Sequence, residues 1–69
     1  MAKYYVFAVN SCDYSMSFTH DDYDDAFETL KRIVDEMPAI LFPIKGCILD
    51  DNMEVVESIM IKDKKDGMD

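Results

Sequence analysis

The sequence contains few of the residues that interrupt regular secondary structure. It has two glycines and two prolines among 69 residues. Such a low content of breakers predicts long, regular elements joined by short turns. At this length, folding buries only about 60% of the surface that the unfolded chain exposes, so the core must be thin. Natural domains of this size draw further stability from disulfides, metals or oligomerisation, which makes a partner or a second copy worth seeking.

Cysteine and long apolar runs are also scarce. Cys12 and Cys47 stand 35 residues apart without a CxxC motif. Because secreted mini-proteins normally carry four or more cysteines, both are predicted to be unpaired thiols of a cytoplasmic protein. The apolar run at residues 4–9 is too short for the core of a signal peptide, and no run approaches the ~18 residues of a membrane span. The expected localisation is therefore the cytoplasm, without membrane contact.

Basic residues are outnumbered by acidic ones. Seven lysines and arginines face 15 aspartates and glutamates, which gives a formal net charge of -8. This balance, with no basic stripe, disfavours direct binding to nucleic acid and to anionic membranes. The charge favours a basic protein surface as partner, although a net charge of this size also serves simply to keep a small protein soluble. The hydrophobic fraction of 49% predicts a folded chain.

A hairpin is predicted at the N-terminus. Residues 3–9, KYYVFAV, are aromatic or apolar on both alternating faces, which predicts a central strand covered on both sides. Residues 10–13 have turn chemistry, and residues 14–18 then alternate apolar and polar side chains. The alternation predicts a second strand with one face in solvent.

The most regular pattern in the chain is helical and runs from Asp21 to Met37. Its apolar residues fall at offsets 0, 3, 4, 7, 10, 11 and 14: Tyr23, Ala26, Phe27, Leu30, Ile33, Val34 and Met37. Thr19, Asp21 or Asp22 can cap the start of this helix, and Pro38 ends it. On its polar face Glu28 and Arg32 are four residues apart, the spacing of a stabilising ion pair.

Two more strands complete the predicted fold. Residues 38–43, PAILFP, are bracketed by prolines and predict an extended crossing buried against the core. Residues 44–49 and 54–62 predict a second hairpin, whose turn at residues 50–52 lacks glycine. The layout is ββαββ, an α+β two-layer domain in which one helix covers one face of a four-stranded, mainly antiparallel sheet. The domain is expected to span residues 1–62, followed by a charged, frayed tail at residues 63–69.

The predicted core lies between this helix and the sheet. Tyr23, Phe27, Leu30 and Val34 are expected to face the sheet, above Phe7 and one alternating set of the strand at residues 44–49.

Carboxylates gather in two segments, and these are the candidate partner-binding residues. The first segment supplies Asp21, Asp22, Asp24, Asp25 and Glu28, and the second supplies Asp50, Asp51 and Glu54. One interpretation is an acidic face that meets arginines and lysines of a partner through charge-assisted hydrogen bonds. The other is a well-capped, solvated helix start. Mimicry of nucleic acid would require both segments on one face, because one acidic residue per helical turn recurs only every ~5.4 Å.

Sequence features of catalytic and metal sites are missing. Neither acidic segment has the order of a calcium-binding loop, whose central glycine is absent from both. His20 is the sole histidine, and the carboxylates beside it favour its protonated form over a neutral base. Cys12 and His20 would form a nucleophile and base only if the hairpin brought them together. We therefore expect no enzyme, no cofactor and no metal.

In size, acidity and layout the chain resembles the small orphan proteins of bacteriophages and other mobile elements, which include anti-CRISPR and anti-restriction inhibitors. The resemblance is one of type over the whole chain: a capped acidic helix, then a hairpin that contains CILDDNMEVVES, residues 47–58. It implies a stoichiometric inhibitor that occupies the basic nucleic-acid-binding surface of a host protein, and it assigns no residue to that role. The alternative is a homo-oligomeric structural or accessory protein that dimerises through the sheet face left open by the helix.

Overall fold

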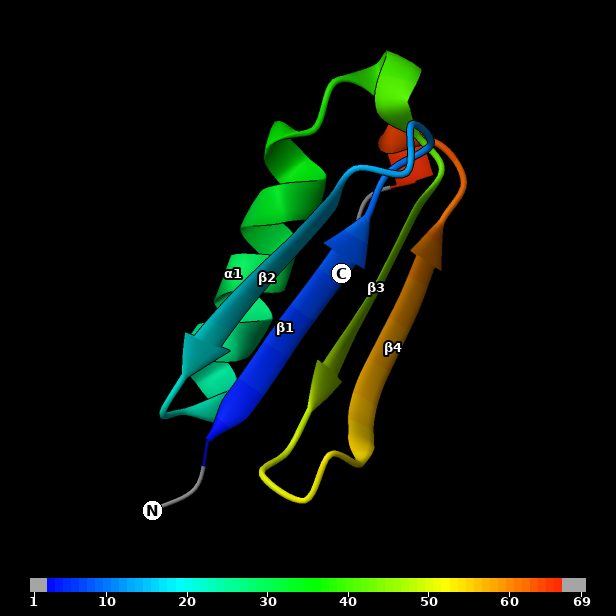
Figure 1. Ribbon diagram of the computed structural model, residues 1–69. Helices are drawn as coiled ribbons and strands as arrows, with labels where there is room; N and C mark the ends of the chain where they lie inside the picture. Colours follow the sequence, from blue (N-terminus) through cyan, green and yellow to red (C-terminus); the bar gives the residue numbers. More distant parts are fainter. Residues whose placement is uncertain (1–2, 67–69) are drawn as a thin grey trace.

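Four antiparallel strands form one sheet in the order β2-β1-β3-β4. The computed structural model describes residues 3–66. The strands are β1 (Tyr4–Val9), β2 (Ser15–His20), β3 (Ile44–Leu49) and β4 (Val55–Ile61). The helix α1 (Tyr23–Glu36) lies across one face of the sheet (Figure 1). The predicted α+β fold and its ββαββ order are confirmed.

Local chemistry sets the limits of α1. The carboxylate of Asp22 is the N-cap and accepts a hydrogen bond from the backbone N–H of Asp24 at 3.0 Å. At the other end the N–H of Met37 donates to the carbonyl of Ile33 at 3.1 Å, and Pro38 follows. Because proline has no N–H to donate, the helix cannot continue through it. The structure thus selects Asp22 from the three predicted caps.

The core fills the space between α1 and the sheet. Its buried apolar side chains are Val6, Ala8, Ala26, Leu30, Val34, Met37, Ile44 and Ile48. The helical stripe faces the sheet as predicted, with Tyr23 and Phe27 half-buried at its margin. The prediction that Phe7 lies in this core is wrong, because Phe7 lies on the opposite face of the sheet and is 40% exposed.

Small residues explain which face of β1 meets the helix. Ala8 pairs with Gly46 across β1 and β3, and Leu30 packs directly over this row. A Cβ on Gly46 would lie 2.7 Å from the Cδ1 of Leu30, far inside van der Waals contact. Since β1 is apolar on both faces, its alternation alone could not show that Val6 and Ala8, rather than Phe7, would face the helix.

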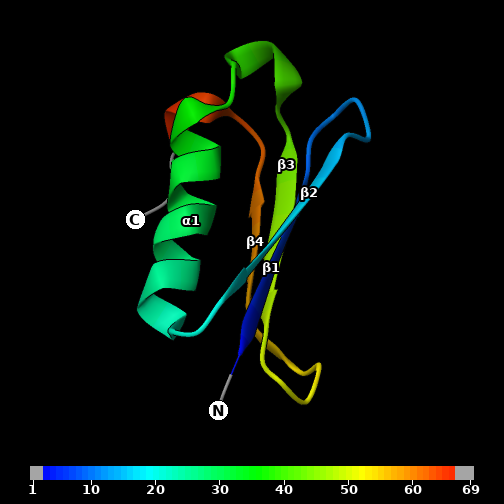
Figure 2. The same ribbon diagram turned by 60° about the vertical axis from the view of Figure 1, so that its left-hand side comes forward.

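The first strand is central in the sheet, as predicted, but within the described residues of one chain it is covered on one side only. Figure 2 shows α1 on one side of the sheet and no described element on the other. Residues 38–43 do not cross the open face; they form the short 3-10 helix η1 (Ala39–Leu41), in which Ile40 is 86% exposed. This segment joins the end of α1 to the start of β3 at one end of the sheet, so it serves as a connection there. Phe42 alone packs against the core cluster.

The second hairpin and the chain end complete the fold. Asp50 accepts hydrogen bonds from the N–H groups of Asn52 and Glu54, at 2.8 and 3.0 Å, and Met53 adopts a positive φ of 63° in place of the missing glycine. After β4 the chain forms a second 3-10 helix, η2 (Lys64–Asp66). The expected tail therefore begins as a short helix, and its residues 67–69 lie outside the described residues.

Candidate functional site

The register of the sheet brings the two acidic segments to the same end of the molecule. Tyr4 pairs with His20 on β2, and Tyr5 pairs with Leu49 on β3. The acidic segments continue directly from these two partners, into the start of α1 and into the β3–β4 turn. Because only β1 separates β2 from β3, the segments leave the sheet about 10 Å apart. Figure 1 shows both at the lower end of the molecule, and we call this region the acidic end.

Three of the eight predicted binding residues have structural roles at the acidic end. Asp22 caps α1 and Asp50 holds the β3–β4 turn, as described above. Asp21 accepts a hydrogen bond from the ammonium group of Lys3 at 2.9 Å, in an ion pair whose side chains are 49% and 66% exposed. The hydrogen bond and the charge of Lys3 lower the pKa of Asp21, and the same hydrogen bond and the charge of Asp21 raise the pKa of Lys3.

The other five predicted residues are available to a partner. Asp24, Asp25, Glu28, Asp51 and Glu54 are exposed, and none of them forms a hydrogen bond through its side chain or an ion pair with another of residues 3–66. The predicted pair between Glu28 and Arg32 is wrong, because no such contact within 4 Å exists among these residues. These five carboxylates are therefore exposed to water and form no ion pair within residues 3–66.

The acidic end concentrates the charge of the protein. It carries the eight carboxylates and, among the described residues, one cation, Lys3, which leaves a net charge of -7 out of the formal -8. At the opposite end the charges nearly cancel, with four lysines against five carboxylates: Lys45, Lys62, Lys64 and Lys65 against Asp13, Asp35, Glu36, Asp63 and Asp66. The sequence shows the total charge, but only the strand pairing shows how unevenly it is distributed.

Aromatic packing anchors the start of α1 beneath these carboxylates. The ring of Tyr23 stands edge-on to Tyr4, with centroids 5.8 Å apart, and stacks on Phe27 at 6.2 Å. Burial, followed by the negative charge of Glu57, raises the pKa of Tyr23. The acidic segment of the helix is thus fixed to the sheet, and its side chains project from a rigid support.

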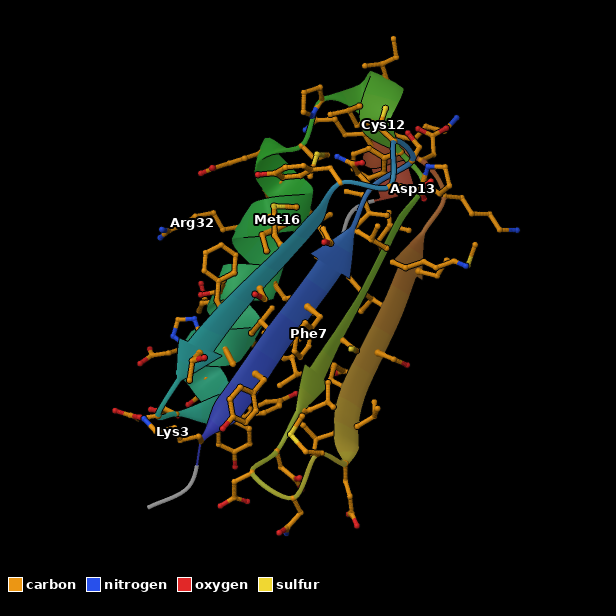
Figure 3. All side chains as sticks on the ribbon, viewed as in Figure 1. Lys3, Phe7, Cys12, Asp13, Met16 and Arg32 are labelled. Carbon is orange, nitrogen blue, oxygen red and sulfur yellow. The ribbon has the colours of Figure 1, made fainter. Side chains whose placement is uncertain are left out.

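The open face of the sheet is a second candidate surface, and the sequence predictions assigned no residue to it. Its central apolar side chains are Tyr5, Phe7, Val9, Cys47, Leu49, Val55 and Met60, with Ser15, Ser17, Thr19, Ser58 and Lys45 around them. No carboxylate projects from this face at the paired strand positions. A hollow of about 550 Å³ lies here between β2, β1, β3 and β4. Figure 3 shows Phe7 near the middle of the sheet.

The remaining chemistry-bearing side chains do not converge. Cys12 lies in the β1–β2 turn, whereas His20 ends β2 at the far end of the sheet, so the hairpin keeps this pair apart. His20 is instead half-buried and hydrogen-bonds through Nε2 to the hydroxyl of Thr29 at 2.7 Å. Both cysteines are free, as predicted.

Metal-ligating side chains are not clustered in the described part of the chain. Within residues 3–66, no three histidine, cysteine, aspartate or glutamate side chains are grouped so that they could hold a metal ion. The carboxylates of the acidic end are therefore spread over a surface rather than directed at one point. In the same part of the chain, no helix has both the length and the apolar character needed to cross a membrane.

Comparison with known proteins gives no relative: no family model, no curated protein and no solved structure matches the chain.

Proposed function

We propose that the protein is an acidic protein-interaction module that binds a basic surface of a partner through its acidic end. The observation that carries this proposal is the meeting of two acidic segments, far apart in the sequence, at one end of the sheet. Five exposed carboxylates there form no ion pair with another of the described residues. Opposite charge on a partner would supply the missing pairs as charge-assisted hydrogen bonds.

The proposed class of partner follows from the competition between carboxylates and nucleic-acid phosphates for a basic surface. A row of arginines and lysines that binds nucleic acid is one kind of strongly basic protein surface. A module with a local charge of -7 competes with phosphates for that row and gains on-rate from long-range attraction. Together with the resemblance in type to phage-encoded anti-CRISPR and anti-restriction proteins, this favours a stoichiometric inhibitor of a nucleic-acid-binding host protein. No catalytic step is part of the proposal.

The magnitude of the effect depends on how deeply each carboxylate is buried in the complex. Truncation of one member of a buried, hydrogen-bonded charge pair costs about 2 to 5 kcal/mol, whereas a pair at the rim mainly changes the association rate. Three reversed carboxylates should therefore weaken binding by more than about tenfold, which requires only ~1.4 kcal/mol in total.

The test compares three forms of the protein as bait in a lysate of its native host. The test variant carries Asp24→Lys, Asp25→Lys and Glu28→Lys, and the matched control carries Asp35→Lys, Glu36→Lys and Asp63→Lys. Both changes alter the net charge equally, but the control alters the opposite end. A partner that is retained by the parent and the control, and lost by the test variant, supports the proposal.

Folding must be separated from binding, because lysines in the first turn oppose the helix dipole. A neutral variant, Asp24→Asn with Asp25→Asn and Glu28→Gln, removes the same charges without reversing them. Circular dichroism first establishes that each variant keeps the parent's helix content and melting temperature. If a folded test variant binds the captured protein as tightly as the parent does, the acidic end is only a solvated surface and the proposal is wrong.

A further inference from the structure

We propose that the open face of the sheet is the interface of a two-fold symmetric dimer, in which the long axes of the two copies run antiparallel. This inference does not depend on the partner of the acidic end. It rests on three observations: the composition of the open face, the one-sided position of α1, and the distribution of charge along the strands.

The composition of the open face is that of a buried surface. An antiparallel sheet whose second face is simply solvated alternates apolar side chains inward with polar side chains outward. Here β1 instead presents Tyr5, Phe7 and Val9 to the open side, and β4 adds Met60, which is 55% exposed. Although the chain has 15 acidic residues, this face has one charged strand position, and it is a lysine, Lys45.

Charge indicates what covers this face. The open face offers a strongly basic partner no electrostatic attraction, because the one charge on the face is positive. Such a partner is attracted to the acidic end instead. A second copy brings an uncharged apolar centre of the same shape, and its carboxylates lie beyond the edges of the contact. Self-association is therefore compatible with a formal net charge of -8, provided that the two acidic ends are kept apart.

Symmetry permits two arrangements, and electrostatics selects one. If the two-fold axis runs along the strands, two acidic ends of charge -7 lie side by side. If the axis crosses the strands, the acidic ends lie at opposite ends of a molecule 38 Å long, several times the ~8 Å screening length at physiological salt. In the second arrangement β3 lies over β3 of the second copy, and β4 lies over β4. Lys45 of each copy then faces Leu49 of the other copy, next to the β3–β4 turn that carries Asp51 and Glu54.

The size of the face sets the expected affinity. Four strands about 4.8 Å apart, each about six residues of ~3.3 Å, give a face of roughly 19 by 20 Å, or about 400 Å² in projection. Projecting side chains raise the accessible area above this value, toward the ~600 Å² per copy at the lower limit of standard interfaces. The dimer is therefore a weak, concentration-dependent one. The carboxylates at the start of α1 stay outside the contact, at both ends of the dimer.

A native cysteine reports the arrangement. Cys47 pairs with Phe7 on one side and with Ser58 on the other, in the row at the middle of the strands. A two-fold axis that crosses the strands passes over this row, so the Cys47 residues of the two copies face each other. With the axis along the strands, Cys47 instead faces β1. Because packed sheets lie ~10 Å apart, too far for an unstrained disulfide, a short bismaleimide cross-linker is the suitable probe.

The experiment combines mass and cross-linking in a Cys12→Ser background, which leaves Cys47 as the sole thiol. Sedimentation equilibrium from about 1 µM to about 1 mM covers the range of weak specific interfaces. We expect the mass to rise from 8.0 kDa toward twice that value, and the cross-linker to give a covalent dimer. Met60→Glu, at an exposed position, should remain folded and monomeric, whereas Ile40→Glu, at an exposed position outside the face, should dimerise as the background protein does. A constant mass of one chain overturns the proposal, as does a dimer that Met60→Glu leaves intact or that Cys47 does not cross-link.

Discussion

Leu30 is the side chain on which the packing of helix and sheet depends most directly. It is fully buried, and its Cδ1 occupies the space that a Cβ on Gly46 would need. Leu30→Ala removes buried methyl groups and leaves a cavity, at a cost of about 2 to 5 kcal/mol in the free energy of unfolding. Because a core of this size supplies only about 3 to 5 kcal/mol, the variant should be close to unfolded at room temperature.

The contact with Gly46 makes the prediction sharper through a double-mutant cycle. In the parent, Gly46→Ala places a methyl group 2.7 Å from Leu30 and 3.2 Å from the carbonyl oxygen of Phe7, an overpacking that costs about 1 to 3 kcal/mol. The substitution also reduces the conformational entropy of the unfolded chain, which stabilises the folded state by about 0.4 to 1 kcal/mol. In the Leu30→Ala background the first clash is gone, so Gly46→Ala should be nearly neutral or stabilising. The two substitutions should therefore compensate each other by about 1 kcal/mol or more.

Urea denaturation followed by circular dichroism measures all four corners of the cycle, with a stabilising osmolyte present throughout if Leu30→Ala is too unstable alone. Ile40→Ala is the control, because it removes a similar side chain that is 86% exposed and should change stability by less than about 0.5 kcal/mol. Equal costs of Gly46→Ala in both backgrounds would refute the close approach of Leu30 to β3. A Leu30→Ala variant as stable as the parent would refute the position of the core itself.

Three further predictions concern thiols, an ion pair and the helix end. Cys12 and Cys47 should both titrate as free thiols after unfolding, and the melting temperature should be the same with and without reductant; an absence of free thiol would show that they pair. Lys3→Met should raise the pKa of Asp21, measured by NMR titration, because Lys3 lowers that pKa; an unchanged pKa would contradict the pairing. The pair therefore stabilises the fold at neutral pH and ceases to do so as the pH falls through the pKa of Asp21. Lys64→Met should lower the free energy of unfolding by about 1 kcal/mol, because Lys64 donates hydrogen bonds to the carbonyls of Asp35 and Met37 at the end of α1, at 2.8 and 2.7 Å. Lys65→Met, which loses no such bond, should change stability little, and equal effects of the two would count against this cap.

The sequence predicts an element correctly where its apolar residues occupy only one face, because that face must then be the buried one. The apolar stripe of α1 repeats without a mismatch, and Pro38 marks its end, so both the helix and its buried face follow from the sequence. The strand at residues 14–18 alternates, and Met16 accordingly packs toward the core. The strand at residues 4–9 is apolar on both faces, so no local signal distinguishes Phe7 from Val6 and Ala8. That choice depends on Gly46, which is about 40 residues away in the chain and becomes a neighbour only when β3 pairs with β1.

The candidate site shows the same division. Local pattern identifies Asp22 among the possible caps and marks both acidic segments, but strand order decides that the segments share one end of the molecule. The open face was missed as a set of residues because its members come from four strands and show no common motif. One signal in the sequence did point to it: a strand that is apolar on both faces needs a second cover, and a single helix supplies only one.

The central claim, that the acidic end binds a basic surface, is tested most directly by titration of a captured partner against matched variants. Dissociation constants for the parent, for Asp24→Lys with Asp25→Lys and Glu28→Lys, and for the control at Asp35, Glu36 and Asp63 are measured at two salt concentrations. The account predicts a loss of more than about tenfold for the first variant, little change for the control, and a salt dependence that is smaller in the first variant than in the parent. Equal affinities of all three folded proteins would contradict it.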